Sequence, residues 1–190
     1  TIPKSSAYFE PEIYTGNGSS KTISTLNFQP DWVWIKNRAT TDMNVLFDSY
    51  RGATKRLASD STAAEATEVQ DLTAFNTNGF TVGTSGAVNT NSVSYASWNW
   101  KANGAGSSNT DGSITSTVSV NTTSGFSIVK YTGTGNGGVN TVGHGLGVIP
   151  KVIIIKALTT TQGWYQYHES LGNTKVIDFT TAAAVTNSCS

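Results

Sequence analysis

The chain has 190 residues with 12 basic and 12 acidic side chains, so its formal net charge at neutral pH is zero. Such a chain has no net field to attract nucleic acid or an acidic membrane surface, and we expect neither as a partner. Charged residues make up only 13%. Abundant Ser, Thr, Asn and Gly take their place, and these residues favour strands and turns over helices. We therefore predict an all-β protein.

The predicted strands start at residues 32–36, which are dense in aromatic and β-branched side chains and follow the turn signal at Pro30. Residues 45–48 would pair with them in a hairpin. Residues 62–72 contain alanines and acids and predict one or two helical turns. Residues 151–156 and 164–168 predict a second hairpin of the same kind. The other predicted strands are residues 80–83, 95–100, 115–120 and 126–131.

Three expectations concern processing of the chain, disulfide bonds and membrane spans. The chain begins at Thr1 without a charged and apolar leader, so we expect a processed product or a fragment of a longer protein. The single cysteine, Cys189, has no partner for an internal disulfide, and we expect an exposed thiol. The most apolar stretch, residues 148–155, is strand-sized, so we expect no membrane span.

The sequence contains an internal repeat in two blocks. In the first block, Phe9 and Tyr14 recur as Phe126 and Tyr131, and the same spacing holds for the three residues that follow: Thr15, Gly16 and Gly18 recur as Thr132, Gly133 and Gly135. In the second block the spacing is three residues larger: Pro30, Ile35, Lys36, Gly52, Thr54, Lys55, Ala63 and Ala64 recur as Pro150, Ile155, Lys156, Gly172, Thr174, Lys175, Ala183 and Ala184. The matching residues keep a constant spacing on each side of one small loop insertion. This indicates that the chain contains two copies of one scaffold.

The repeat predicts the domain organisation. Residues 1–102 form the first copy, residues 103–110 form a linker of Gly, Ser and Asn, and residues 111–190 form the second copy. Within these 190 residues the second copy has no counterpart of residues 71–102. We therefore predict two related β-sandwich or jelly-roll-like copies, the second incomplete, and we expect another chain to complete it by strand addition or lateral packing.

Candidate catalytic acids do not recur between the copies. Asp31, Asp48 and Glu65 correspond to Lys151, His168 and Val185, so a carboxylate pair of the glycosidase kind is not retained. The Gly-rich residues 133–138 lack the ending of a phosphate-binding loop. We therefore expect no enzyme, no catalytic residue and no cofactor.

The two histidines show no metal-ligand spacing, and we expect no metal site. His144 lies between glycines and is interpreted as a turn residue, with contact to a ligand as the alternative. His168, which follows Tyr167, stays a tentative ligand-binding residue.

The tryptophans are the remaining candidates. Trp32 and Trp34 become Val152 and Ile154 in the second copy, so we assign them to the core. A sugar-stacking role stays open for Trp98, Trp100 and Trp164. Together with Asn99 and His168, these are the tentative ligand-binding residues.

Five segments carry a resemblance to a known family: residues 30–38, 47–52, 96–102, 109–115 and 142–147. Together they resemble a repeated domain of tail and fibre proteins of bacteriophages that infect marine bacteria and cyanobacteria. The resemblance covers nearly the whole chain and implies a location on the virion surface, outside the cell. It brings no catalytic site. Members of that family usually continue through the end that the second copy lacks.

Three functions follow as expectations. The leading one is a virion structural protein, a tail-fibre or appendage subunit that assembles with copies of itself, as a trimer or filament, and with other virion proteins. The second is a lectin-like module that binds host surface polysaccharide. The third and least favoured is a polysaccharide depolymerase.

Overall fold

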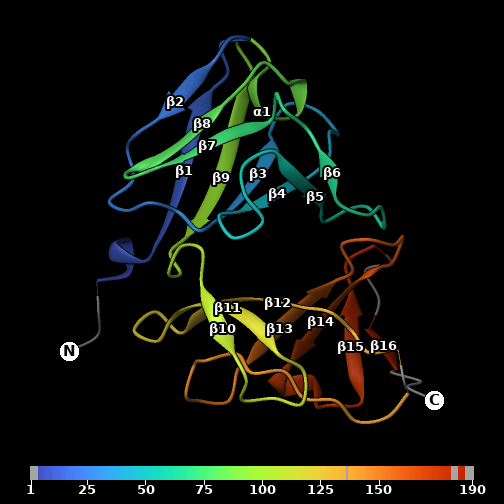
Figure 1. Ribbon diagram of the computed structural model, residues 1–190. Helices are drawn as coiled ribbons and strands as arrows, with labels where there is room; N and C mark the ends of the chain where they lie inside the picture. Colours follow the sequence, from blue (N-terminus) through green and yellow to red (C-terminus); the bar gives the residue numbers. More distant parts are fainter. Residues whose placement is uncertain (1–3, 136, 181–183, 187–190) are drawn as a thin grey trace.

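The computed structural model describes residues 4–135, 137–180 and 184–186, and the regular secondary structure of this part is almost wholly β-strand (Figure 1). Its helical elements are short, namely η1 (Ser5–Ala7), α1 (Gly86–Asn89) and η2 (Glu169–Leu171). None of the described helices is long and apolar enough to cross a membrane. The all-β prediction is confirmed.

The first copy packs two antiparallel sheets face to face. The larger has strand order β1-β9-β3-β4-β5-β6 and the smaller β2-β8-β7. Val33, Ile35 and Phe47 from the larger sheet meet Phe80 and Val82 from the smaller, and all five are fully buried. The strands of this copy are β1 (Phe9–Thr15), β2 (Lys21–Ile23), β3 (Trp32–Asn37), β4 (Val45–Asp48), β5 (Lys55–Ala58), β6 (Ala66–Thr67), β7 (Leu72–Asn76), β8 (Gly79–Val82) and β9 (Ser94–Trp100).

The second copy repeats part of this arrangement. One sheet has the order β13-β14-β15-β16, which matches β3-β4-β5-β6, and the other has the order β10-β11-β12. Under the spacings of the internal repeat, β12 corresponds to β1 and β13 to β3. The strands are β10 (Ser107–Asn109), β11 (Ser116–Asn121), β12 (Phe126–Tyr131), β13 (Val152–Lys156), β14 (Trp164–His168), β15 (Lys175–Asp178) and β16 (Ala184–Thr186).

The two copies differ where β9 lies in the first one. There β9 pairs with β1 on one side and with β3 on the other, and so joins them in one sheet. In the second copy β12 and β13 belong to separate sheets. Ile153 and Ile155, the counterparts of Val33 and Ile35, are 41% and 46% exposed, whereas Val33 and Ile35 are 0% exposed. The second copy is thus open on the face that forms the core of the first.

One local prediction was wrong. Residues 62–72 contain no helix; they contain β6 and the start of β7. The Arg56 guanidinium binds Glu68 and Asp71 at 3.0 and 3.1 Å, and these long-range ion pairs hold the acidic segment against β5. The linker, residues 103–110, includes β10, because its Ser and Asn backbone finds ladder partners on β11. The prediction for Cys189 falls outside the described residues.

Candidate functional site

Four tryptophans lie on one face of the larger sheet, opposite the core of the first copy. Trp32 and Trp34 alternate with buried Val33 along β3, and the antiparallel register places Trp32 beside Trp100 and Trp34 beside Trp98. Side chains two residues apart on a strand share a face, and cross-strand partners do as well. We call Trp32, Trp34, Trp98 and Trp100 the aromatic face.

One half of the aromatic face contacts the second copy. Phe126, on β12, stacks on Trp32 with ring centroids 5.6 Å apart and planes 9° apart, and on Trp100 at 6.2 Å. Our assignment of Trp32 and Trp34 to the core is therefore corrected: both are half-buried, and both pack against a cluster that includes Leu46 and Trp164. Their apolar side chains pack at the junction between the copies, because alternation along β3 places Val33 and Ile35 on the core face and the two tryptophans on the opposite face.

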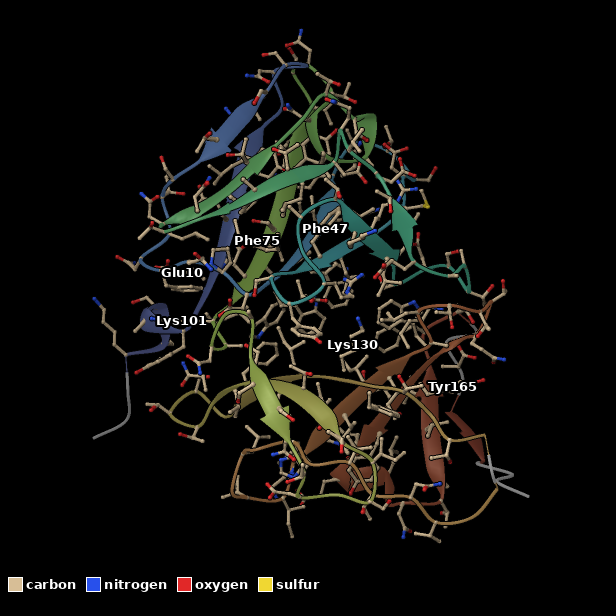
Figure 2. All side chains as sticks on the ribbon, in the orientation of Figure 1. Glu10, Phe47, Phe75, Lys101, Lys130 and Tyr165 are labelled. Atoms are coloured by element: carbon tan, nitrogen blue, oxygen red, sulfur yellow. The ribbon has the colours of Figure 1, made fainter. Side chains whose placement is uncertain are left out.

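Hydrogen bonds and a charge reinforce this junction. The Gln162 N–H donates to the Thr62 carbonyl at 2.9 Å, and the Glu65 N–H donates to the Leu158 carbonyl at 2.8 Å. Lys130, labelled in Figure 2, lies between the two copies, and its ammonium is 5.4 Å from the ring centroid of Tyr50. Stacked rings together with directional backbone bonds fix the orientation of one copy on the other.

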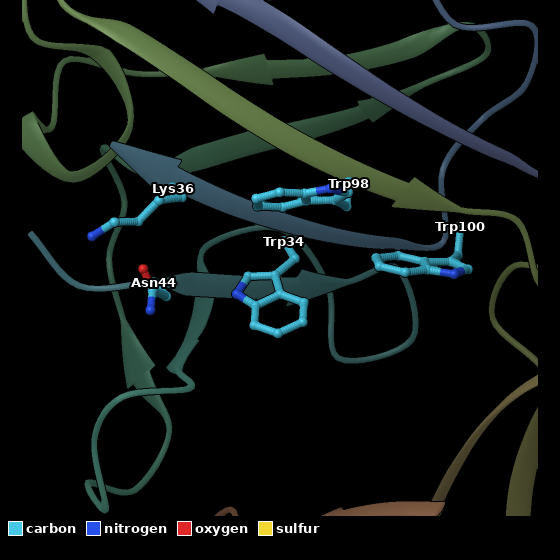
Figure 3. Close-up of a pocket in the computed structure, with 5 residues that line it drawn as sticks. All are labelled: Trp34, Lys36, Asn44, Trp98 and Trp100. Atoms are coloured by element: carbon cyan, nitrogen blue, oxygen red, sulfur yellow. The ribbon is translucent and has the colours of Figure 1, made fainter. Parts of the chain in front are cut away.

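The other half of the aromatic face borders a hollow of about 400 Å³. Trp34, Trp98, Trp100, Lys36 and Asn44 line it (Figure 3). The Trp34 and Trp98 rings are tilted by 59° with centroids 6.1 Å apart, and Trp98 is 36% exposed. Aromatic rings flanked by an ammonium and an amide can stack on the apolar face of a sugar ring and bond its hydroxyls.

Polar groups at one end of the hollow hold its loop in place. The Lys36 Nζ donates to the Asp42 carbonyl at 2.6 Å, and the Asn44 N–H donates to the Asp60 carboxylate at 3.0 Å. The Asn44 Oδ1 is buried and has no hydrogen-bond partner among the described residues.

The structure brings together only two of the five predicted ligand-binding residues, Trp98 and Trp100. Asn99 is 0% exposed, and its Nδ2 donates to the Glu10 carbonyl and the Ser97 hydroxyl. It lies on the opposite side of β9 from its neighbours because side chains alternate along a strand. We therefore correct the prediction that Asn99 binds a ligand: its side chain is buried within the first copy.

Trp164 and His168 also lie away from the hollow. Trp164 is 4% exposed, and its Nε1 donates to the Ala58 carbonyl at 2.8 Å across the junction, so it is a buried anchor and not a surface platform. His168 ends β14, where its Nδ1 accepts from the Ser170 N–H at 3.2 Å and caps η2.

Three residues of the hollow escaped the sequence reasoning, namely Trp34, Lys36 and Asn44. The alternation of side chains along a strand could have identified Lys36, since it follows Trp34 by two residues and therefore shares its face. Asn44 lies in a loop, and only the fold brings it to the aromatic face.

The candidate acids have structural partners. The Asp31 carboxylate, on a residue that is 3% exposed, accepts from the Ala102 and Gly104 N–H groups at 2.7 and 3.2 Å, so it anchors the exit from the first copy. Asp48 pairs with Arg51.

Burial raises the pKa of the Tyr14 phenol, whose hydroxyl donates to the Val88 carbonyl, and burial lowers the pKa of Lys156 at the junction. Within the described ranges, no three His, Cys, Asp or Glu side chains cluster to hold a metal ion.

The architecture defines an all-β protein made of two related copies that are joined through an aromatic face. The chain belongs to the family described as domain of unknown function DUF7483, whose model matches residues 4–190. Searches of the curated proteins and of the solved structures each find no match.

Proposed function

We propose that the chain is a structural protein of a bacteriophage virion, a tail-fibre or appendage subunit displayed on the particle surface outside the cell. The junction between the copies supports this role. Phe126 stacked on Trp32, together with the bond from Gln162 to Thr62, makes two β-rich units a single stiff body. Stiffness along a line of joined units is what a projecting appendage requires, and low charge suits lateral packing.

Immunogold labelling tests the proposed location. An antibody raised against the purified chain should label the outside of intact particles, with an antibody against a capsid protein as the positive control. Label inside infected cells that never appears on particles would contradict the proposal.

Assembly with other virion proteins and with copies of the chain, as a trimer or filament, is part of the proposal. The support is the open face of the second copy, where Ile153 and Ile155 are exposed. Sedimentation velocity of the purified chain over a range of concentrations tests self-association. A species that stays monomeric throughout would limit assembly to other virion chains.

A second candidate function, recognition of host surface polysaccharide, is favoured by the hollow beside Trp34 and Trp98. Titration with host lipopolysaccharide should quench tryptophan fluorescence, and Trp98→Ala should weaken binding by about tenfold, the loss expected for one stacking contact. Ile13→Ala is the matched control, because Ile13 is 61% exposed on the same sheet and does not line the hollow. Equal binding by both variants, or none by the folded wild type, would remove this candidate.

A further inference from the structure

A second hollow lies at the junction, next to the one that Trp34 and Trp98 line. Its volume is about 280 Å³. Both copies contribute to its wall: Ser5, Tyr8, Phe9 and Trp100 come from the first copy, and Thr123, Ser124 and Phe126 come from the second. Trp100 also lines the first hollow, so a single ring belongs to the walls of both. The two hollows are therefore neighbours on the aromatic face.

The two hollows follow one another along β9. Lys36 and Trp100 lie at opposite ends of the first hollow, and the other two tryptophan rings lie between them (Figure 3). The register of the sheet agrees, because Lys36 lies beside Ala96, four residues along the strand from Trp100. That spacing corresponds to about 13 Å. A ligand that occupies both hollows is therefore an elongated chain and not a single ring.

The far end of the first hollow carries a positive charge that no acidic side chain balances. Lys36 forms no ion pair among the described residues, and its ammonium donates to the neutral carbonyl of Asp42. The Asp42 carboxylate does not line the hollow and accepts from Asn37 and Thr40, each at 2.7 Å. An ammonium beside tryptophan rings suits a ligand that combines an apolar ring face with a negative group. A uronate, which is a sugar ring with a carboxylate, has both.

The second hollow offers hydroxyl groups in place of a charge. The hydroxyls of Ser5, Tyr8 and Thr123 form no hydrogen bond with the described residues, and no Lys or Arg lines this hollow. Such hydroxyls can donate to and accept from the hydroxyls of a sugar. Phe9 adds an apolar surface there, with its ring centroid 4.9 Å from that of Trp100. The site therefore has a charged end and a neutral end.

We propose that the two hollows form one binding site for an acidic polysaccharide. A uronate ring lies between the aromatic rings and Lys36, and the chain continues across Trp100 into the second hollow. This inference rests on the second candidate function, recognition of host surface polysaccharide, and adds the class of sugar and the extent of the site. It also gives the junction a role in binding, because a site that spans both copies needs them held in one orientation.

Defined uronate oligomers test the charged end of the site. The probes are hexamers of galacturonate, mannuronate and guluronate, and their methyl esters are neutral counterparts with the same length and linkage. In calorimetric titrations of the full chain, at least one acid hexamer should bind about fivefold more tightly than its ester, the upper value for one ion pair at a surface. Added salt should reduce this preference, because it screens the charge.

Variants of Lys36 assign the preference to its charge. Lys36→Met keeps an unbranched apolar side chain without the ammonium, so it should abolish the preference and leave binding of the ester within about twofold. Lys36→Arg should retain the preference. Lys21→Met is the matched control, because Lys21 is also half-buried but lies on β2 in the smaller sheet, and it should bind as the wild type does. Circular dichroism checks that each variant is folded.

The length of the oligomer separates the two hollows. A trimer should occupy the first hollow alone, so Trp98→Ala should weaken the binding of both trimer and hexamer. Thr123→Ala removes one hydroxyl from the second hollow and should weaken only the hexamer, by about threefold. Thr122→Ala is its matched control, because Thr122 is exposed in the same turn but does not line the hollow.

Three outcomes would overturn the inference: no binding of any acid hexamer at millimolar concentration, equal binding of acid and ester, or a preference that Lys36→Met retains. Hexamer binding that Thr123→Ala leaves unchanged would contradict a site that spans both hollows. Host lipopolysaccharide that binds through Trp98 despite any of these results would preserve the candidate function and remove only the inference. The two failures are therefore distinguishable.

Discussion

The first and second copies carry the same strand in different surroundings. In β3, Val33 and Ile35 are fully buried, because β9 and the smaller sheet cover them. In β13, Ile153 and Ile155 occupy the corresponding places and are nearly half exposed. The second strand is the more apolar of the two in sequence and the less buried in the structure. Apolarity therefore reports the capacity of a strand to be buried, and the presence of covering elements decides whether it is.

The largest expected difference between the copies concerns their ion pairs. Arg51 binds Asp48 and Glu65 with side-chain exposures of 6%, 11% and 22%, whereas Lys151 and Glu169 pair at 67% and 52% exposure. Arg51→Ala should lower the free energy of unfolding by about 4 kcal/mol, because it leaves buried carboxylates uncompensated. Lys151→Ala should change it by less than about 1 kcal/mol. Urea unfolding measures both, and similar losses would contradict the contrast.

The next contrast uses one substitution at equivalent positions. Ile35→Ala should cost about 3 kcal/mol, because it leaves a cavity in a closed core. Ile155→Ala, at 46% exposure, should cost less than about 1 kcal/mol. The midpoints of chemical unfolding, followed by tryptophan fluorescence, provide the comparison. If Ile155→Ala were as costly as Ile35→Ala, the second copy would be covered in solution by something other than the described residues.

The smallest effect is expected at the junction. Trp164→Phe retains an aromatic ring but removes the Nε1 donor to the Ala58 and Ser61 carbonyls and leaves a small cavity where the five-membered ring was, at a cost of about 2 kcal/mol. Trp98→Phe, at the exposed end of the aromatic face, should change stability by less than about 0.5 kcal/mol. Calorimetric unfolding of both variants tests this, and an unchanged Trp164→Phe would argue that the junction depends on stacking alone.

Much of the fold follows from local sequence patterns. Residues 45–48, 126–131 and 164–168 were predicted as strands with the bounds that β4, β12 and β14 have. Short polar strands such as β2, β6 and β10 carry no such pattern, because ladder partners hold them and apolar side chains do not. The helical prediction for residues 62–72 was wrong for a related reason, since long-range pairing with Arg56 overrides local propensity.

The candidate site was less predictable than the fold. Spacing along the strand placed Trp98 and Trp100 on one face, and both line the hollow, whereas Asn99 is buried and Trp164, for which core and ligand-facing roles were both open, is a buried anchor. Alternation identifies which residues share a face of a strand but not which face is covered. Trp34 and Asn44 complete the hollow because β3 and the following loop approach each other in space.

The sequence by itself determined the all-β class, the positions of the main hairpins and the existence of two related copies, because these depend on composition and on spacings along the chain. The tertiary structure alone decided which face of each strand is buried, that Phe126 and Trp164 join the copies, and that the second copy is open beside β13. These features depend on contacts between residues far apart in sequence, and no local pattern encodes the partner that covers a face.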